Sequence, residues 1–448
     1  MNAKSHRKTL KTFAGLPDHY FDDKNALNYS FFIQDDIAKA AGEKPAPYDD
    51  ALHRDHIRSF YADGSETAIY VQIPWCEFRC TYCYYFRGLY HNDESARRLI
   101  RAEKEHAVLL DEEIGLDGKH VNSIYFGGGT PTILREELLD EILSFFVNRY
   151  AHPHSEICCE SSLSTLTPAK LDILQKYVTR LSIGIQSFNN RLLRLVERRF
   201  TATQAEDLLR DIVPRFPNVN IDLIYGLQSQ SMEDWLDSVR KAIELEVPSV
   251  TVYRLELRHE VPMVKAFRKR PEEFPNEVET QGMYLLAKEM FLDAGYVENL
   301  VGWFLLPKVP DTVVYRERWE KQTPCVAFGP DVHNYGENHF YDNFQEIDAY
   351  VSAVEHGALP VRHFYTMTLK QRLMWYMVSQ WKSNSPIYRP VMAARYGEDQ
   401  VNWFLGLIKN YVDWNALRIT NDKVELTDCG TAILEWILRD TIDKAFGK

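Results

Sequence analysis

Short apolar runs and amphipathic stretches alternate along residues 67–310 of this chain. Residues 68–73 form a β-rich run, and residues 95–114 then repeat apolar side chains with the helical period. The alternation continues, with further predicted strands at residues 121–126, 156–160, 178–185, 219–225 and 249–255. Strand–helix units in succession favour a parallel sheet with its helices outside.

The number of these units limits how the sheet can close. Six strand–helix units are too few for a closed eight-stranded barrel, so the pattern predicts an α/β fold, a partial, open (β/α)6 TIM-like barrel. Thr167-Pro168 supplies a helix N-cap followed by proline, and Ser231 with Asp234 forms a capping box. The carboxyl ends of the strands should carry the active site.

Segments of different character flank the predicted barrel, residues 67–310. Residues 1–66 are polar and are expected to form an N-terminal arm, which either wraps a domain or begins as a partly disordered tail. Residues 311–365 are expected to be an irregular segment on the substrate side. In residues 366–448, predicted helices and a small β-ribbon indicate a C-terminal winged-helix-like module, which we expect to cover a site rather than read DNA.

Composition and charge narrow the functional classes. The formal net charge of −12 argues against binding nucleic acid as the main task, which needs clustered Lys and Arg. The seven cysteines are unevenly spread and do not resemble a disulfide framework. No stretch approaches the roughly 18 apolar residues of a membrane span, and the basic N-terminus lacks the apolar core of a secretory signal. We therefore expect a cytoplasmic protein with reduced thiols.

Three of the cysteines carry the strongest chemical pattern. Cys76, Cys80 and Cys83 follow the first predicted strand with the spacing C-x3-C-x2-C. Thiolates are soft ligands that suit iron–sulfur clusters, and three of them leave one iron of a [4Fe–4S] cluster open. The open iron can chelate S-adenosylmethionine (SAM), and an electron from the cluster can then break a carbon–sulfur bond to give a 5′-deoxyadenosyl radical. A structural zinc site would need a fourth ligand, and the nearest candidate, His91, is eight residues on.

A glycine-rich segment follows the second predicted strand. Residues 125–132 read Tyr-Phe-Gly-Gly-Gly-Thr-Pro-Thr. Glycines let backbone groups approach a ligand closely, and carbonyls there could hold the ammonium of a methionine moiety. The alternative is a tight strand-to-helix turn that needs a positive φ. The position of the segment, one strand after the cysteine loop, favours ligand binding.

Four motifs together resemble one enzyme group. They are Y-x-x-I-P-x-C-x3-C-x-Y-C from residue 70, Y-F-G-G-G-T-P-T from 125, R-L-S-I-G-I-Q-S-F from 180 and N-I-D-L-I-Y-G-L from 220. The sequence resembles, over about residues 66–440, the radical SAM group built around oxygen-independent coproporphyrinogen III oxidase. That group also includes haem chaperone-like proteins and class C radical methyltransferases.

The resemblance implies contacts to SAM from the first two strands. Tyr70 would pack on the cofactor near the cluster. Gly128, Gly129 and Thr130 would hold its methionine end.

The following strands would supply the polar side chains of the same site. The resemblance implies that Glu160 binds the adenosylmethionine moiety and that Gln186 contacts its ribose or carboxylate. Arg198 would face a carboxylate as a fixed fork donor, and Asp222 would hold a ribose hydroxyl. Without the resemblance, Gln186, Arg198 and Asp222 could equally be strand-end or surface residues.

Departures from the group's patterns indicate a branch. The oxidase has a cysteine where Tyr85 stands and a histidine where Gln72 stands. Haem chaperone-like proteins carry H-N-x-x-Y-W where residues 315–319 keep only the final tryptophan. The methyltransferase branch remains, and it implies two SAM molecules and methylation of an sp2 carbon. Oxidative decarboxylation of coproporphyrinogen III and non-enzymatic haem binding are the alternatives.

The implied partners are small molecules and a reductant. The substrate would be an aromatic, heteroaromatic, quinone or tetrapyrrole compound, and an electron donor such as flavodoxin or ferredoxin would reduce the cluster. Among other residues that could carry chemistry, a buried structural role is favoured for Cys158, Cys159, Cys325, Cys429, Trp375, Tyr376 and Trp381, although Cys325 lies in a segment that could approach the site.

Overall fold

The computed structural model describes residues 34–447, except residues 43, 45, 62–65, 86–87, 258–260, 308, 310–318 and 337. Six strands lie side by side in chain order and run parallel, which confirms the predicted open barrel. These are β2 (Thr67–Ile73), β5 (Val121–Gly128), β6 (Ala151–Ser161), β7 (Arg180–Gln186), β8 (Asn218–Tyr225) and β9 (Ser249–Arg254).

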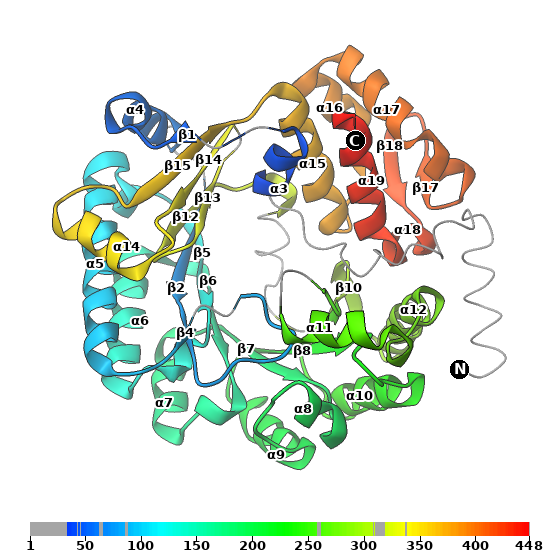
Figure 1. The fold of residues 1–448 in the computed structure, drawn as a ribbon, viewed down its shortest axis with the longest axis horizontal. Coiled ribbons are helices and arrows are strands. Elements are labelled where there is room, and N and C mark those ends of the chain that lie inside the picture. The colour runs from blue at the N-terminus through cyan, green and yellow to red at the C-terminus, as the bar shows by residue number, and fades with distance from the viewer. Residues whose placement is uncertain are drawn as a thin grey trace.

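Helices cover the outer face of this curved sheet (Figure 1). Two of the predicted helix starts are confirmed: the Thr167 hydroxyl accepts from the Lys170 N–H at 3.2 Å, and Ser231 and Asp234 cap each other reciprocally. The outer helices are α5 (Asp93–Ile114), α6 (Glu136–Tyr150), α7 (Pro168–Tyr177), α8 (Asn190–Leu195), α9 (Ala202–Ile212), α10 (Met232–Glu244) and α12 (Glu277–Asp293).

The sheet continues beyond both ends of the parallel block, to 13 strands in all among the described residues. At one end, β9 is followed by the antiparallel strands β11 (Trp303–Leu305) and β10 (Val297–Leu300). At the other end, β12 (Cys325–Phe328) pairs in parallel with β2, although the two strands are far apart in the sequence. An open sheet, rather than a closed barrel, results.

The expectation that residues 311–365 are irregular is wrong for the described part. That part contains β12, β13 (His333–Tyr335), β14 (His339–Asn343), α14 (Ile347–Glu355) and β15 (Val361–Thr366). The strands are short and carry polar residues whose side chains complete the backbone pairing. The Asn334 side-chain Oδ1 accepts from the Ala327 N–H at 2.7 Å, and the Asn343 side-chain amide donates to the Gly329 carbonyl at 2.9 Å. The prolines and glycines of this segment favoured an irregular chain, and buried asparagines interrupt the apolar pattern that would have marked its strands.

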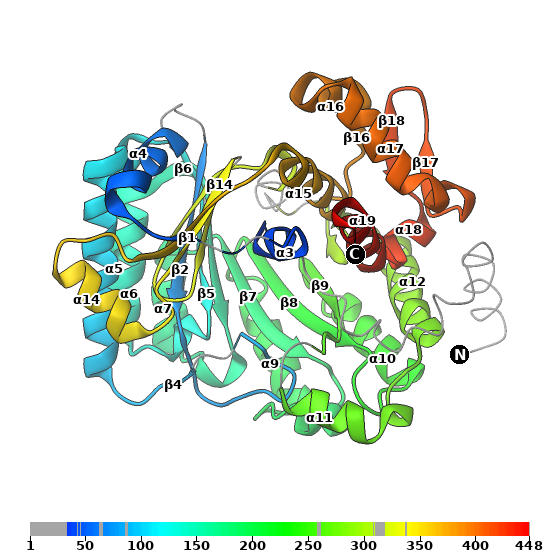
Figure 2. The same cartoon turned by 45° about the horizontal axis from the view of Figure 1, so that its top comes forward.

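The described part of the N-terminal segment lies along two other parts of the chain. Helix α3 (Gln34–Ala40) places Ile37 and Ala38 in the core of the C-terminal module. Strand β1 (Ala46–Pro47) pairs antiparallel with β15, and α4 (Asp50–Phe60) follows it. Figure 2 shows α3 beside α15 above the open sheet. Residues 1–33, including the expected tail, lie outside the described residues.

The C-terminal module has the predicted order of helices and ribbon. Helices α15 (Leu369–Lys382), α16 (Arg389–Tyr396) and α17 (Glu398–Asp413) precede β17 (Leu417–Ile419) and β18 (Lys423–Leu426), and β16 (Ile387–Tyr388) adds a third strand. Two further helices, α18 (Asp428–Ala432) and α19 (Leu434–Phe446), follow the ribbon. Among the helices described, none is long and apolar enough to cross a membrane.

Gly329 follows β12 directly and lies where this strand meets the barrel, so a substitution there tests how closely the two pack. It has a φ of +108°, and a Cβ there would lie 2.6 Å from the Gln72 Cβ and 2.8 Å from a Glu103 carboxylate oxygen. Gly329→Ala should lower the free energy of unfolding by about 3 kcal/mol, from backbone strain plus overpacking. Gly357→Ala is the control, because Gly357 has a φ of +72° with nothing within 4 Å and should cost only about 1 kcal/mol. Equal losses in urea denaturation would contradict this account.

Candidate functional site

The cysteine loop begins where β2 ends. Strand β3 (Trp75–Cys76) pairs with β4 (Gly88–Leu89), which ties the two ends of the loop together. Cys80 is buried, Cys76 and Cys83 are half-buried, and all three are free thiols. The three cysteines border one cavity of about 1680 Å³.

Two donors reach the sulfur atoms of this loop. The Thr130 hydroxyl lies 3.6 Å from the Cys76 Sγ, and an Arg198 Nη lies 3.6 Å from the Cys80 Sγ. Burial raises the pKa of the Cys76 thiol, whereas the hydrogen bond from Thr130 lowers it. The donors therefore favour the thiolate form that a metal ligand needs.

The donor set fits an iron–sulfur cluster better than a single ion. Three thiolates with no fourth side chain are typical of a cluster with one open iron. Within the described part of the chain, no three His, Cys, Asp or Glu side chains are spaced to hold a single metal ion.

The glycine-rich segment packs directly against the cysteine loop. The Gly129 N–H donates to the Ile73 carbonyl at 2.8 Å, and the Thr130 N–H donates to the Trp75 carbonyl at 2.8 Å. A Cβ on Gly129 would lie 2.7 Å from the Ile73 carbonyl oxygen, closer than real Cβ contacts come. Gly129 is thus required for backbone-to-backbone contact between the loops. This structural requirement adds to its expected role in ligand binding.

Glu160 lies at the end of β6 and faces the same cavity. Its carboxylate accepts from the Tyr125 hydroxyl at 2.7 Å and from the Gly128 N–H at 3.1 Å. Burial raises the pKa of Glu160, and the bond from Tyr125 partly offsets this. Tyr125 lies in the glycine-rich motif but was not among the predicted SAM contacts. It is paired in register with Tyr70, and their rings stack at 5.8 Å.

Gln186 and Arg198 border the cavity, and each has a buried polar atom whose hydrogen-bonding capacity the described residues do not satisfy. Gln186 ends β7 with a φ of +73°, beside a register shift that turns its side chain. The Arg198 guanidinium donates to the Gly184 carbonyl. Among the described residues, the Gln186 Oε1 and the Arg198 Nε have no hydrogen-bond partner. Buried groups of this kind require a ligand or water.

Asp222, on β8, is the remaining predicted polar residue. It accepts from the Asn220 amide at 2.9 Å. Burial, and then the nearby Glu160 carboxylate, raise the pKa of Asp222 to about 7.

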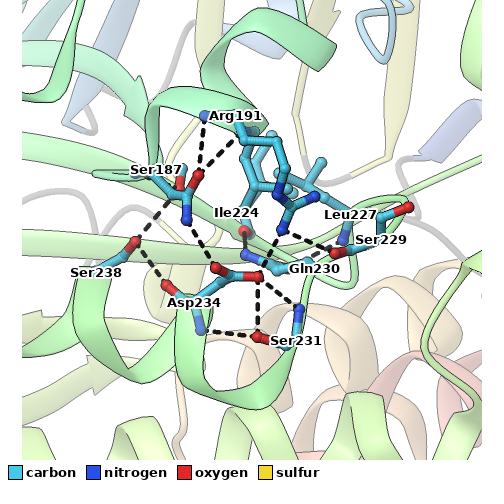
Figure 3. A network of polar contacts seen from close by, with 11 residues as sticks. Ser187, Arg191, Ile224, Leu227, Ser229, Gln230, Ser231, Asp234 and Ser238 are labelled. Atoms are coloured by element: carbon cyan, nitrogen blue, oxygen red, sulfur yellow. Dashed lines mark hydrogen bonds and ion pairs between the residues drawn. The ribbon is translucent and has the colours of Figure 1, made fainter.

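A polar network behind the site fixes the loops that follow β7 and β8 (Figure 3). The Asp234 carboxylate accepts from the Asn189 amide and from the Arg191 guanidinium, both at 2.7 Å. The Ser238 hydroxyl accepts from the Phe188 N–H at 3.1 Å. Because α8 begins at Asn190, this network also sets the place of Arg198 a few residues later.

The far wall of the cavity is aromatic and comes from outside the barrel. Trp319, Tyr335 and Trp375 border it, and the Trp375 ring lies 5.3 Å from Trp319 and stacks 6.3 Å from Tyr335. Trp375 was expected to be core and is 8% exposed, but it borders the cavity as well. Tyr376 and Trp381 lie in the module core as expected.

The remaining cysteines are buried. Burial raises the pKa of the Cys158, Cys159 and Cys429 thiols, in keeping with a structural role. Cys325 is 1% exposed on β12 and also borders the cavity.

All eleven predicted site residues border this one cavity. They are Tyr70, Cys76, Cys80, Cys83, Gly128, Gly129, Thr130, Glu160, Gln186, Arg198 and Asp222.

Parts of this chain are similar to known proteins. Residues 70–242 match the Radical SAM superfamily. The haem chaperone HemW of Lactococcus lactis is 30% identical over 244 residues, which are 53% of this chain and 62% of that protein. The oxygen-independent coproporphyrinogen III oxidase of Bradyrhizobium diazoefficiens is 27% identical over 331 residues, 69% of this chain and 71% of that protein.

The likeness in structure extends further than the likeness in sequence. The coproporphyrinogen III oxidase HemN of Escherichia coli superposes with a TM-score of 0.72 at 19% identity, over 94% of both chains. At that identity the likeness shows the fold alone. The chain spans about three fifths of the length of the first curated relatives that it matches, which are 60–62% covered.

The raised pKa of Asp222 predicts a pH-dependent stability. Between about pH 4 and pH 7, the folded carboxyl keeps its proton while the unfolded one loses it, so the wild type loses stability as the pH rises through that range. Asp222→Asn removes this loss, and its advantage over the wild type should grow up to about pH 7 and stay constant above. Urea denaturation of the iron-free protein at several pH values measures the difference. The exposed Asp413→Asn is the control, and a parallel curve for both variants would contradict the prediction.

Proposed function

We propose that this chain, whose residues 70–242 match the Radical SAM superfamily, cleaves S-adenosylmethionine to methylate an unsaturated carbon. The [4Fe–4S] cluster would be held by Cys76, Cys80 and Cys83. The convergence of all eleven predicted residues on one cavity is the observation that carries the proposal.

The cluster would supply one electron to SAM bound at its open iron. The chain's own groups would orient that molecule. Glu160, already fixed by Tyr125, would face the methionine ammonium beside the glycine-rich loop. Through the atoms that lack partners among the described residues, the Arg198 Nε–H would donate to a carboxylate and the Gln186 Oε1 would accept from a ribose hydroxyl. Asp222 would likewise accept from a ribose hydroxyl.

The size of the cavity supports a second occupant. Pockets for single small ligands are on the order of 300–1,000 Å³, and this cavity is about 1680 Å³. It can therefore hold two SAM molecules, as methylation by this route requires, or one SAM molecule with a large substrate.

The aromatic far wall supports a flat substrate. Trp319, Tyr335 and Trp375 border the cavity, and aromatic rings stack on flat conjugated molecules. An aromatic, quinone or tetrapyrrole compound fits this wall. The names of the relatives, which refer to haem and coproporphyrinogen, favour the tetrapyrrole class.

Methylation is favoured over the alternatives by the residues beside the cluster loop. Tyr85, where the oxidase has a cysteine, bonds to the Tyr84 hydroxyl at 3.1 Å, and Tyr84 in turn donates to Glu256 at 2.8 Å. Gln72 accepts from the Tyr70 hydroxyl at 3.2 Å. Neither environment offers the thiol or imidazole of the oxidase pattern. Oxidative decarboxylation stays the second candidate because of the relative that the chain matches over 69% of its length. Non-enzymatic haem binding is the third, and residues 315–318, on which it depends, lie outside the described residues.

The proposed compartment follows from the thiolate ligands, and the proposed electron donor follows from the need to reduce the cluster. Thiolate ligands stay reduced in the cytoplasm, the compartment that we propose. A flavodoxin or ferredoxin is the proposed electron donor.

Replacing Cys76, Cys80 and Cys83 together by Ala should abolish the brown chromophore and all SAM cleavage. The thiolates are the proposed ligands, so iron content measured after anaerobic reconstitution should fall to background. Cys429→Ala is the control and should keep its iron, because this thiol is buried in the C-terminal module. Full iron retention in the triple variant, with native circular dichroism, would refute the cluster assignment.

The products of SAM distinguish methylation from decarboxylation. With the true substrate, 5′-deoxyadenosine and S-adenosylhomocysteine should form in comparable amounts, because one SAM molecule takes a hydrogen atom and the other gives up its methyl carbon. Deuterium from a labelled methyl group should appear in the 5′-deoxyadenosine. Carbon dioxide and 5′-deoxyadenosine from coproporphyrinogen III, without S-adenosylhomocysteine above background, would favour the oxidase instead.

A further inference from the structure

We propose that basic side chains on the cysteine loop and on the segments packed against it dock an acidic one-electron carrier protein. This basic collar consists of Arg79, Arg194, Arg199, Lys265 and Lys269, all of which are exposed. The inference rests on the proposed cluster and extends it to the surface through which an electron arrives.

Three separate segments meet at this surface because two helices dock on the cysteine loop. The Met263 N–H, in α11 (Pro262–Lys269), donates to the Thr81 carbonyl at 3.0 Å. The Thr81 hydroxyl donates to the Leu195 carbonyl, at the end of α8, at 3.2 Å. Thr81 is the neighbour of Cys80, so both helices touch the loop beside a proposed ligand. Figure 2 shows α11 on the lower edge of the barrel, away from the C-terminal module.

Part of the charge is held on the loop itself. The Arg199 guanidinium lies over the Phe78 ring, 4.9 Å from its centroid. Phe78 is 8% exposed, and it lies with Arg79 between Cys76 and Cys80. A cation stacked on a buried ring keeps its position and remains available to an anion on the outer side.

The collar departs from the charge of the rest of the protein. Residues 190–200 hold four arginines and one glutamate, a net charge of +3, and residues 262–273 hold four basic and two acidic residues, a net charge of +2. Residues 76–85 are neutral, with Glu77 and Arg79. The whole chain has a net charge of −12. A positive surface on an acidic protein steers acidic partners to one place.

Not every basic residue of these segments belongs to the collar: Arg198 borders the cavity, and the fold pairs Arg191 and Arg270. Arg191 forms an ion pair with Asp234 at 2.7 Å and donates to the Ser229 carbonyl at 3.0 Å (Figure 3). Arg270 pairs with Glu273 at 2.6 Å.

The position of the collar identifies the kind of partner. None of its five residues borders the cavity, so a docked protein and a substrate would not compete for the same side chains. A carrier docked next to Cys80 has a short path for its electron to the proposed cluster. Interfaces between electron-transfer partners are typically small, and charge steers their encounter. In the step itself, the carrier loses one electron and the cluster gains it, with no atom transferred.

Charge reversal in the collar tests the docking surface. The probe is reduced flavodoxin, an acidic carrier, mixed with the reconstituted enzyme in a stopped-flow instrument while the visible absorbance of the cluster bleaches. Arg194→Glu with Lys265→Glu should lower the second-order rate constant about tenfold or more at low ionic strength, and high salt should reduce the difference. Lys370→Glu with Lys409→Glu, an equal charge change on the C-terminal module, is the matched control and should stay within twofold of the wild type.

Dithionite separates this inference from the proposed function. Dithionite-driven SAM cleavage should be equal in the wild type and in both double variants, since none of these side chains borders the cavity. No cleavage with dithionite in the wild type would refute the proposed function, whereas the bleaching rates would still report on docking. Equal flavodoxin rates in the collar variant and the wild type would overturn the inference. So would binding of a DNA oligonucleotide that charge reversal abolishes while the flavodoxin rate stays unchanged.

Discussion

The contact between the cysteine loop and the glycine-rich loop is the constraint on which the site depends. Strands β2 and β5 are neighbours in register, with Ile73 opposite Gly128, so their loops leave the sheet side by side. Two backbone hydrogen bonds then join Gly129 and Thr130 to the other loop. Each bond contributes only about 1 kcal/mol net. Their effect is geometric, because any side chain on Gly129 would separate the cysteines from the groups that face them.

The buried polar residues behind this contact lower the stability of the fold, but their side chains are held in fixed positions. Burial of a charged group costs several kcal/mol unless partners compensate for it. Arg180, fully buried beneath the site, lies 4.5 Å from the Trp303 ring and donates to the Cys158 Sγ at 3.0 Å. Glu160 and Asp222 have raised pKa values for the same reason. Such a set is held in place before any ligand binds, which is the arrangement that a binding site for a zwitterion requires.

The two sides of the cysteine loop face different proposed partners. Toward the cavity, the barrel supplies the proposed SAM contacts, while β13, α15 and the short helical segment at Trp319 supply the aromatic wall. Trp319, Tyr335 and Trp375 lie outside residues 70–242, the part shared with the superfamily. Substrate choice should therefore depend on the added strands and module, and the chemistry on the shared barrel. The basic collar lies on neither wall, so electron supply need not interfere with substrate entry.

The sequence by itself determined the six parallel strands, their helices and eleven of the positions that border the cavity. Parallel strands are buried on both faces and read as short apolar runs, and the cysteine and glycine motifs are local in the chain. Only the tertiary structure decided the rest. The pairing of Cys325 with Ala68 brings β12 to the barrel across most of the chain, and the buried Asn334 and Asn343 disguise its neighbours as loop. The direction in which Trp375 faces depends on what packs around it, and no local pattern records that.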